Sequence, residues 1–579
     1  MVCWNLEDIY PQNKKQELIK ELNSSVDLFV SKQTTLTSKI SSKDFLFLLN
    51  LSETISSISN KLSVKTYLKH CENVADTNTL KEMQELNLLL TNLENKLIFF
   101  SHFIKELDDV NAKRLQKDLG KFSYSFEEIR KSRKYMRTLE EEKIMNLKDV
   151  SGEDVLSTLR NIITGKFSFE MDGKILNESE LTALITNGAP EIQIKAYQKL
   201  LNKYQENQDV LSEIYKGLTL DWYNESVKIR NYKSSIASRN FSNTLSDETV
   251  KMLLDLIREK RNVFQKYFRL KSKVLKLKHS RYHTYAPYIL KDKKKYDYDF
   301  SKKIVLEVYQ EFSSTTYEFA KKIFDVKHVH SDLLSNKKGG AFCYSYDKDE
   351  VPYILLNHND DLNSLLTMAH EFGHGIHGQL AKDKTQSTYH APLAIAETAS
   401  IFGEILLIEY LQKNCSSEEK KYLLFNHIDG LFASILRQAY FVIFELQAHE
   451  KISEGASVEE LNELYFNLLK EQFGEDMEIP EEFKYEWLRI PHIYESPFYC
   501  YAYAFGNLLV LALHAKYQTE GKPFVETYLN ILKSGGDADI EDILKRAGIA
   551  VNDKSFWEGA FVNLEKEIAK LETILKNKN

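Results

Sequence analysis

Two histidines and an acidic residue stand at metal-ligand spacing in the segment 370–374, which reads HEFGH. On an α-helix, His370 and His374 lie about 40° apart on one face, because each residue turns the helix by about 100°. Both imidazoles can then reach one zinc ion at about 2.0–2.1 Å. Glu371 lies one residue further round the helix, where its carboxylate can take a proton from a zinc-bound water. The pattern predicts a zinc site that performs hydrolysis.

The third zinc ligand must come from another element. His377 shares the helix face, but it lies about 10.5 Å along the axis from His370, so one helix cannot bring three such histidines to one ion. We expect a packing or supporting role for His377. Glu397 is the best candidate, because it lies in a segment rich in Ala and Ile that predicts a buried helix, and a buried carboxylate needs a cation. The rival ligands are Glu404, His390 and Asp360.

Glu404 follows Glu397 by seven residues and shares its predicted helix face. We expect it to accept a hydrogen bond from a ligand histidine, as carboxylates around zinc commonly do; a structural salt bridge is the alternative. Three glycines on the first helix would let the two helices pack closely, which would compensate for the low helix propensity of glycine. They are Gly373, Gly375 and Gly378.

A second group of chemically capable side chains lies in the segment 491–506. Peptide hydrolysis builds negative charge on the carbonyl oxygen, and a preorganised O–H or imidazole donor stabilises that charge. We expect His492 and a nearby phenol to be such donors, whereas an aromatic core is the alternative. The tyrosines of the segment are Tyr494, Tyr499, Tyr501 and Tyr503.

The elements that must position these residues can be read from local patterns. The segments 341–346 and 352–357 are β-prone and are joined by a charged turn, which predicts a hairpin. The polar run 359–361 offers helix N-caps, so we expect the helix with the two histidines to begin near Leu362.

Composition sets the broad class of the protein. Of 579 residues, 77 are Lys or Arg and 84 are Asp or Glu, and the net charge of −7 argues against a nucleic-acid partner. With 43% hydrophobic residues the chain is not globally disordered. Gly (21) and Pro (9) are scarce, which favours long helices. No apolar run is long enough to span a membrane, and we expect no membrane partner.

The cysteines and the N-terminus indicate a compartment. The five cysteines are widely spaced, which argues against a disulfide framework and favours a reducing environment. The first residues lack the apolar core of a signal peptide. We therefore expect a cytoplasmic protein, and we favour a monomer.

A break in the helical pattern suggests two domains. Alternating apolar residues around Asp172-Gly173 predict a small hairpin, and the segment 187–190, which reads NGAP, ends the following helix. We expect an N-terminal helical domain with this hairpin over 1–190, and a catalytic domain over 191–579.

Several motifs, in order along nearly the whole chain, resemble those of oligoendopeptidase F-type members of the thimet oligopeptidase family of zinc peptidases. The segment 370–374 with the later Glu397 is the most specific of them, and the others are individually weaker. They are Trp4–Pro11, Tyr282–Pro287, Gly339–Cys343, Glu397–Glu404, Ile490–Tyr501, Asp542–Gly548 and Phe556–Trp557.

This resemblance implies a mainly α-helical, two-lobed fold around a deep substrate channel, with a small sheet or hairpin near the active site. It implies one zinc ion held by His370, His374 and Glu397, with Glu371 as general base. The implied substrates are internal peptide bonds of short, unfolded oligopeptides.

The resemblance also implies roles for residues outside the zinc site. His492 with Tyr499 or Tyr501 would stabilise the transition state. Residues expected to bind substrate are Gly340, Ala341, Phe342, Tyr494 and Tyr503.

Two other functions are compatible with the sequence. A carboxypeptidase would trim one or two C-terminal residues, and it would need a positive group to hold the free carboxylate. A helical peptide-binding protein with a vestigial zinc site would bind peptides without cutting them.

Overall fold

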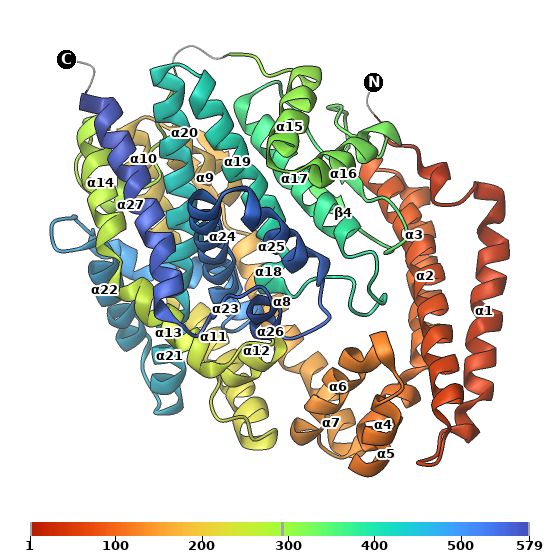
Figure 1. Ribbon diagram of the computed structural model, residues 1–579. Coiled ribbons are helices and arrows are strands. Elements are labelled where there is room, and N and C mark those ends of the chain that lie inside the picture. The colour runs from red at the N-terminus through yellow and green to blue at the C-terminus, as the bar shows by residue number, and fades with distance from the viewer. Residues whose placement is uncertain (1–2, 291–293, 577–579) are drawn as a thin grey trace. The chain divides into compact units, whose positions relative to one another are not determined.

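The computed structural model describes residues 3–290 and 294–576, and most of them are helical (Figure 1). The sheets are small: one pairs two strands and the other pairs three. The predicted mainly α fold is confirmed, whereas the deep substrate channel stays a prediction. Among the residues that the structure describes, none of the helices combines the length and the apolar character needed to cross a membrane.

The chain divides into two compact units, and each is discontinuous in sequence. Unit 1 contains Met1–Lys134, Asp292–Tyr410 and Lys516–Gly548, and unit 2 contains Tyr135–Lys291, Leu411–Ala515 and Ile549–Asn579. The predicted sequence boundary near residue 190 falls within unit 2, between two of its helices. The division into domains 1–190 and 191–579 stays a prediction.

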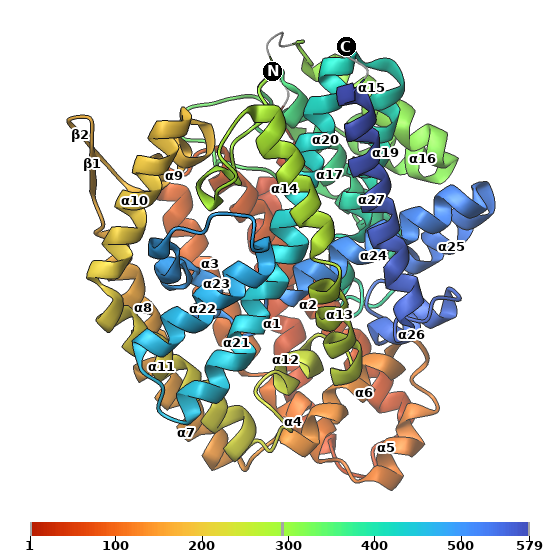
Figure 2. The ribbon, with the colours of Figure 1, turned by 90° about the vertical axis from the view of Figure 1, so that its left-hand side faces the viewer.

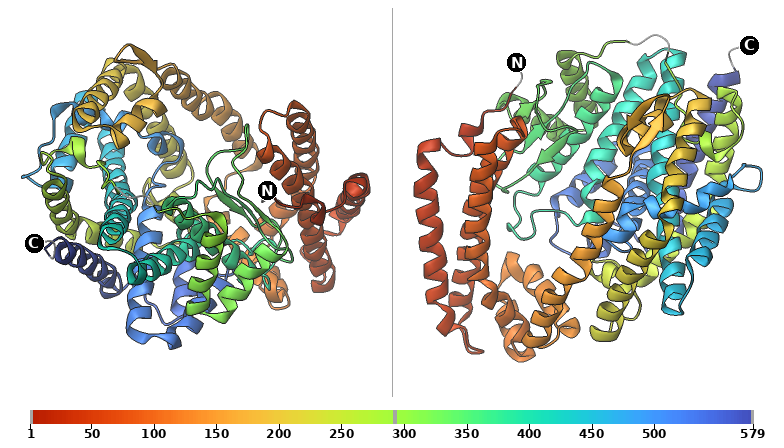
Figure 3. Two further views of the ribbon diagram at one scale, coloured as in Figure 1. Left: turned by 90° about the horizontal axis from the view of Figure 1, so that it is seen from above. Right: turned by 180° about the vertical axis from the view of Figure 1, so that it is seen from behind.

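Unit 1 is built mainly from helices, and its first six helices enclose an apolar core together with residues of the three-stranded sheet. The long helices α1 and α2 lie side by side (Figures 1 and 3), and their core side chains pack together with those of the three-stranded sheet. The helices are α1 (Lys15–Ser31), α2 (Ser42–Glu72), α3 (Thr77–Asn95), α4 (Ile98–Glu106), α5 (Asp109–Gln116), α6 (Ser123–Lys131), α15 (Tyr298–Phe312), α16 (Ser314–Asp325), α17 (Leu362–Leu380), α18 (Leu393–Ala396), α19 (Thr398–Asn414, which continues into unit 2), α25 (Lys522–Lys533) and α26 (Ile540–Arg546).

The sheet of unit 1 confirms the hairpin predicted before the histidine helix. Strands β4 (Phe342–Tyr344) and β5 (Tyr353–Leu355) pair antiparallel, with Cys343 opposite Ile354. A third strand, β3 (Val329–His330), pairs parallel with β5, so that β4 is an edge strand. Sequence reasoning missed β3, because two residues carry no alternating pattern.

Helix α17 lies in the interior of unit 1 and begins where it was predicted. The Asp361 side chain caps its N-terminus by accepting from the backbone N–H of Ser364. The helix packs against α15, α16, α25, β4 and β5. It is therefore surrounded by other elements, which explains why most of its side chains are buried.

Unit 2 is a second helical body, and it carries the other predicted hairpin. Strands β1 (Phe169–Met171) and β2 (Lys174–Leu176) pair antiparallel around Asp172 and Gly173, which both have positive φ. The hairpin extends from the end of the unit that holds α9 and α10 (Figure 2). The helices are α7 (Leu139–Ser151), α8 (Glu153–Gly165), α9 (Glu178–Asn187), α10 (Pro190–Glu206), α11 (Gln208–Tyr223), α12 (Ala237–Ser242), α13 (Asp247–Glu259), α14 (Asn262–Leu275), α20 (Ser417–Leu431), α21 (Arg437–Ser453), α22 (Val458–Phe473), α23 (Pro491–Glu495), α24 (Tyr501–Glu520, which continues into unit 1) and α27 (Lys554–Lys576).

Candidate metal centre

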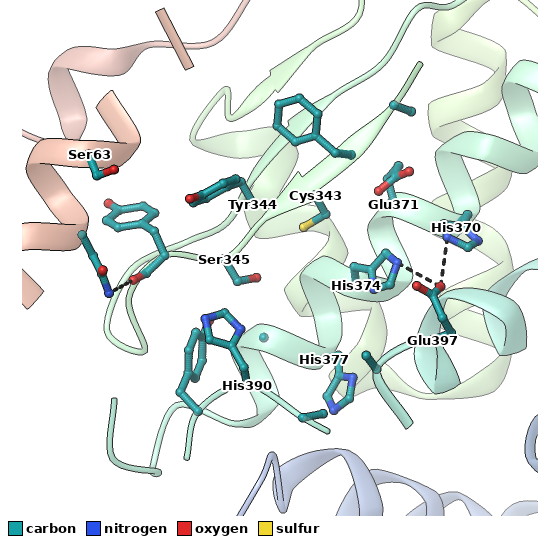
Figure 4. A pocket seen from close by; sticks show the side chains of 18 residues that line it. Ser63, Cys343, Tyr344, Ser345, His370, Glu371, His374, His377, His390 and Glu397 are labelled. Atoms are coloured by element: carbon teal, nitrogen blue, oxygen red, sulfur yellow. Dashed lines mark hydrogen bonds and ion pairs between the residues drawn. The ribbon is translucent and has the colours of Figure 1, made fainter. Parts of the chain in front are cut away.

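Two imidazoles of α17 converge on one carboxylate of unit 1 (Figure 4). The Nε2 atoms of His370 and His374 each lie 3.3 Å from Oε2 of Glu397. One donor atom from each of these three residues lies within 4.8 Å of the others. The structure therefore brings together the three residues predicted as metal ligands. Among the described residues, the rival ligands Glu404, His390 and Asp360 are outside this group.

The local structure and the exposure of Glu397 differ from the prediction. The predicted continuous, buried helix is interrupted at this residue, which lies between α18 and α19. Its side chain is 41% exposed rather than buried. Ser400 Oγ donates a hydrogen bond of 2.8 Å to Glu397 Oε2. The break turns the carboxylate toward the histidines, while the serine of the next helical turn fixes its orientation.

Glu404 contacts His370 from α19, and its supporting role stays a prediction. His370 Nδ1 and Glu404 Oε1 are 2.5 Å apart, so the carboxylate orients the ring from the side opposite Glu397. Sequence reasoning missed Tyr309 on α15, which is buried and donates a hydrogen bond of 2.7 Å to the carbonyl of Ala369. No local signal marks Tyr309, because its partner is 60 residues away.

The glycines of α17 face three different neighbours. A Cβ atom on Gly373 would lie 2.5 Å from Ala399 O and Ser400 Cα, so α17 and α19 approach at backbone distance there. The predicted close packing of the two helices is therefore confirmed at Gly373. At the other two positions the prediction was wrong. Gly375 meets Ile323 of α16 and Cys343 of β4, and Gly378 meets Ser345 and Tyr389.

The site concentrates negative charge around its imidazoles. Burial acts to lower the pKa of His370, but the carboxylates of Glu397 and Glu404 outweigh it and raise that pKa to about 10. Burial acts to raise the pKa of the Glu397 carboxyl, but hydrogen bonds from His370 and His374 outweigh it and hold that pKa well below the usual range. Two carboxylates that stabilise positive charge on the imidazoles form a site that attracts a cation.

Glu371 is the buried acid of the site. Its side chain lies at the wall of the cavity that contains the two histidines (Figure 4). Burial raises the pKa of the Glu371 carboxyl, while the charges of His370 and His374 and a hydrogen bond from the backbone of Cys343 act to lower it. The carboxyl therefore has a raised proton affinity and a fixed orientation, as proton transfer requires.

A cavity of about 600 Å³ opens in front of these residues, and β4 forms one wall. Ala341 and Phe342, both predicted to bind substrate, line it. Gly340 is exposed at the start of this segment, has a φ of +77° and is outside the lining. The other lining residues are Asn60, Ser63, Cys343, Tyr344, Ser345, Tyr346, His370, Glu371, His374, His377, Gly378, Tyr389, His390, Ala391, Ala396 and Glu397.

His377 has the packing position that its distance along the helix predicted. It is 7% exposed, and burial, reinforced by the charge of His374, lowers the pKa of His377 to about 4. It therefore borders the cavity as a neutral imidazole. His390, a rival third ligand, also lines the cavity and is exposed, and burial of part of its ring lowers its pKa.

The predicted histidine–tyrosine group belongs to unit 2. His492, Tyr499 and Tyr503 form a half-buried cluster, in which the ring centroids of His492 and Tyr499 are 6.2 Å apart and those of His492 and Tyr503 are 6.1 Å apart. The Tyr499 and Tyr503 rings meet edge to face at 5.2 Å. Burial and the charge of Arg437 lower the pKa of His492, so the imidazole is neutral and can donate one N–H.

The two other tyrosines of this segment are core residues of unit 2. Tyr501 is 0% exposed and its phenol oxygen accepts 2.8 Å from Asn243 Nδ2, and burial raises the pKa of that phenol. Tyr494 is 1% exposed and lies under the guanidinium of Arg160, 4.5 Å from its ring centroid. Tyr499 and Tyr503 are therefore partly exposed, whereas Tyr494 and Tyr501, which are close to them in sequence, are buried.

The donor set fits a zinc ion by its spacing and its chemistry. Donors on a tetrahedral zinc at about 2.0–2.1 Å are roughly 3.3–3.4 Å apart. Both imidazole nitrogens lie 3.3 Å from the Glu397 oxygen. Two imidazoles and one carboxylate form the ligand set of zinc hydrolases that keep one position for water, and Glu404 on His370 is the supporting carboxylate that such ligands need.

Comparison with known proteins identifies the class. Two family models match, and both describe peptidases: one, Oligopeptidase F, matches residues 104–169, and the other, Peptidase family M3, matches residues 183–563. The second match covers well over half of the chain, and the protein therefore belongs to peptidase family M3. The resemblance to oligoendopeptidase F found in the sequence is confirmed.

Individual relatives carry peptidase names, and solved structures share the fold. Oligopeptidase PepF of Bacillus subtilis is 27% identical over 99% of this chain and 87% of its own length. An oligoendopeptidase F homolog of Borreliella burgdorferi is 28% identical over 86% of each chain. A solved structure from Chlamydophila abortus matches with a TM-score of 0.89 at 23% identity, over 99% of this chain and 98% of that one. Oligoendopeptidase-F from Enterococcus faecium has a TM-score of 0.71 at 19% identity, over 97% and 99%.

Proposed function

We propose that this peptidase is a zinc-dependent endopeptidase that hydrolyses internal bonds of short, unfolded peptides. The observation that carries the proposal is the convergence of His370 and His374 on Glu397 at 3.3 Å, beside the buried carboxyl of Glu371. Zinc held by these three ligands would polarise the scissile carbonyl and make a water molecule acidic enough to lose a proton near neutral pH.

Glu371 is the general base in this proposal. Its carboxyl accepts a proton from the attacking water and then returns it to the leaving amine. The raised pKa of Glu371 supports this role, because a base that must also act as an acid works best when its pKa lies nearer to neutral pH. Glu404 acts through His370, whose ring it holds in the orientation that presents Nε2.

The edge strand β4 binds the substrate backbone in this proposal. Its outer edge is not paired within the described sheet, so an extended peptide can add to it by main-chain hydrogen bonds. Phe342 on this strand and Ala341 directly before it line the cavity in front of the metal site. Binding through the main chain depends little on the side chains of the substrate, which favours broad specificity and excludes folded proteins.

His492 with Tyr499 and Tyr503 stabilises the oxyanion in this proposal. Their partial exposure and the neutral state of His492 support a role as hydrogen-bond donors. The buried phenol of Tyr501 already accepts from Asn243, so we assign Tyr501 and Tyr494 to the packing beneath this cluster.

Cleavage of a doubly blocked, internally quenched peptide of about eight residues tests the function. Internal cleavage that is lost with a chelator and restored by zinc, with products assigned by mass spectrometry, supports the proposal. Trimming of an unblocked peptide alone would instead establish a carboxypeptidase. Zinc-loaded protein that binds peptides without cutting either one would refute the proposal.

Glu371→Gln tests the base separately from the metal. We expect zinc content to match the parent and kcat to fall about 10²–10⁴-fold, the range for loss of a general acid–base group. Glu21→Gln, on an exposed position of α1, is the matched control and leaves kcat unchanged. Parent turnover in zinc-loaded Glu371→Gln would exclude Glu371 as the base.

A further inference from the structure

The turn between α23 and α24, which carries Tyr499 of the histidine–tyrosine cluster, contains a strained residue. Phe498, between α23 and α24, has a φ of +58°, a left-handed conformation that a bulky L-residue rarely adopts. Its ring is 0% exposed and lies 4.5 Å from that of His449 on α21. Tyr499 follows it directly, so the backbone of Phe498 determines where the phenol points. Such a conformation persists only where the surroundings enforce it, and it is often found at functional sites.

A fully buried carboxyl enforces this conformation. Oε1 of Glu445, on α21, accepts a hydrogen bond of 2.7 Å from the backbone N–H of Phe498. Glu445 is 0% exposed, and its Oε2 has no hydrogen-bond partner among the residues that the structure describes. Burial raises the pKa of Glu445 well above its usual range. A buried polar atom without a partner is unfavourable, so packing alone does not explain a glutamate at this position.

A second helix holds the same turn from another side. Arg239 of α12 donates from Nε to Pro497 O at 3.0 Å and from Nη2 to Ser496 Oγ at 3.1 Å. Asn243, just after α12, donates to Tyr501 OH at 2.8 Å. The turn is thus bound at consecutive points before and after the strained residue, and all of these contacts lie within unit 2.

We propose that Glu445 is a positioning residue for the reaction: by holding the backbone N–H of Phe498, it fixes Tyr499 and Tyr503 beside His492. Arg239 shares this role by binding the two preceding residues. The proposal rests on the proposed function, because the placement of these rings affects catalysis only if they act as donors.

Two substitutions separate the hydrogen bond from the volume of the side chain. Glu445→Met fills similar space but offers only a weakly accepting thioether sulfur, whereas Glu445→Gln keeps an accepting oxygen. We expect Glu445→Met to lower kcat about 10–100-fold, since a misplacement of about 1 Å can cost a factor of about 10². KM should stay within about threefold of the parent value, and Glu445→Gln should restore most of kcat.

A control and a second variant guard against general destabilisation. Tyr267→Phe removes a buried hydrogen bond of 2.7 Å to Asp429 in the same unit, between helices that carry none of the cluster. We expect it to keep the parent kcat, and an equal loss of kcat in this variant would overturn the proposal. If Glu445→Met does not fold, Arg239→Met replaces it and is expected to show the same fall in kcat at constant KM.

A fluorine spectrum tests the positioning without turnover. 3-Fluorotyrosine placed at position 499 should give one sharp ¹⁹F resonance in the parent and in Glu445→Gln, and a broadened or split resonance in Glu445→Met. An unchanged spectrum with unchanged kcat would overturn the proposal. If His492→Ala retains the parent kcat, the donor role in the proposed function fails, and the spectrum still decides whether Glu445 holds the ring.

A double variant tests whether Glu445 acts through the cluster. If it does, Glu445→Met should lower kcat little further once Tyr499→Phe has removed the phenol that Glu445 positions. A full additional loss of 10–100-fold in that background would show that Glu445 acts elsewhere, and would overturn the proposal.

Discussion

Gly373→Ala is the substitution that most directly tests the packing of the metal centre. The added Cβ would lie 2.5 Å from Ala399 O and Ser400 Cα, which are backbone atoms that cannot rotate away. Carbon atoms in contact are about 3.5–4.0 Å apart. Helices α17 and α19 would therefore have to separate locally by about 1 Å, or bend, to admit one methyl group.

Moving α17 and α19 apart should affect the positions of the zinc ligands more than the stability of the fold. Overpacking a core by a methyl group destabilises by about 1–3 kcal/mol, while replacing glycine within a helix returns up to about 1 kcal/mol. The net loss of unfolding free energy is about 0–2 kcal/mol, and the protein should fold. Metal–ligand distances, in contrast, tolerate only about 0.2 Å. His374 follows the substituted residue directly, and Glu397 precedes its contacts on α19, so a shift of about 1 Å separates the ligands.

We expect the zinc dissociation constant of Gly373→Ala to rise at least about 10–100-fold, the effect that loss of a supporting residue has at other zinc sites. Competition with a chromophoric chelator measures that constant, and denaturant unfolding of the zinc-free protein measures stability. Gly430→Ala is the matched control. It also lies within a helix, α20, and no described heavy atom lies within 4 Å of a Cβ built there. Its zinc affinity should equal that of the parent.

Parent zinc affinity in Gly373→Ala, together with unchanged unfolding, would refute the reasoning. It would mean that α19 can yield to a methyl group without moving Glu397. A loss of zinc affinity in both glycine variants would also refute it, because the effect would then not arise from the contact at Gly373.

Three further predictions address the charges. Glu404→Ala should weaken zinc binding about 10–100-fold, since it frees the ring of His370 to rotate, and the same competition assay measures this. Lys271→Met should lower the free energy of unfolding by about 1–3 kcal/mol, because it removes the buried ammonium that lies 2.7 Å from Asp429, whose side chain is 25% exposed. A loss below about 0.5 kcal/mol in a denaturant titration would contradict this. Burial and neighbouring carboxylates raise the pKa of Glu153, which means that the folded state disfavours the charged carboxylate. The free energy of unfolding therefore falls as the pH rises through that pKa and the carboxyl becomes charged. Glu153→Gln should therefore be more stable than the parent at pH 7, and the difference in melting temperature should vanish near pH 4.

The parts of the site that the sequence predicted are those set by local geometry. The spacing of His370 and His374 determines that their rings share a face, and the polar run before Leu362 determines where the helix begins. Glu397 and Glu404 could be named because a zinc ion needs a third ligand and its histidines need support. These inferences depend on chemistry and on helix periodicity, and neither requires knowledge of distant contacts.

The parts that the sequence did not predict depend on tertiary packing. The break at Glu397 lies in a segment whose composition favours a continuous helix, and the neighbours of Gly375 and Gly378 come from α16, β4 and a loop. The tyrosines of the segment 491–506 are alike in type and close in sequence. Their burial differs because Tyr494 contacts residues of α8 and α11 and Tyr501 contacts Asn243 just after α12, and no local pattern reveals the positions of these elements.

The three glycines of α17 also bear on the order in which the protein assembles. Each lowers the intrinsic stability of the helix by about 0.8–1.0 kcal/mol relative to alanine, so the isolated segment spends little time helical. The backbone of α19, the side chain from α16 and the strand β4 must therefore be in place before the two imidazoles are held on one face. We expect a chain emerging from the ribosome to bind zinc weakly through this motif, and to acquire its metal only after α19, the last of these elements along the chain, has been synthesised to Asn414.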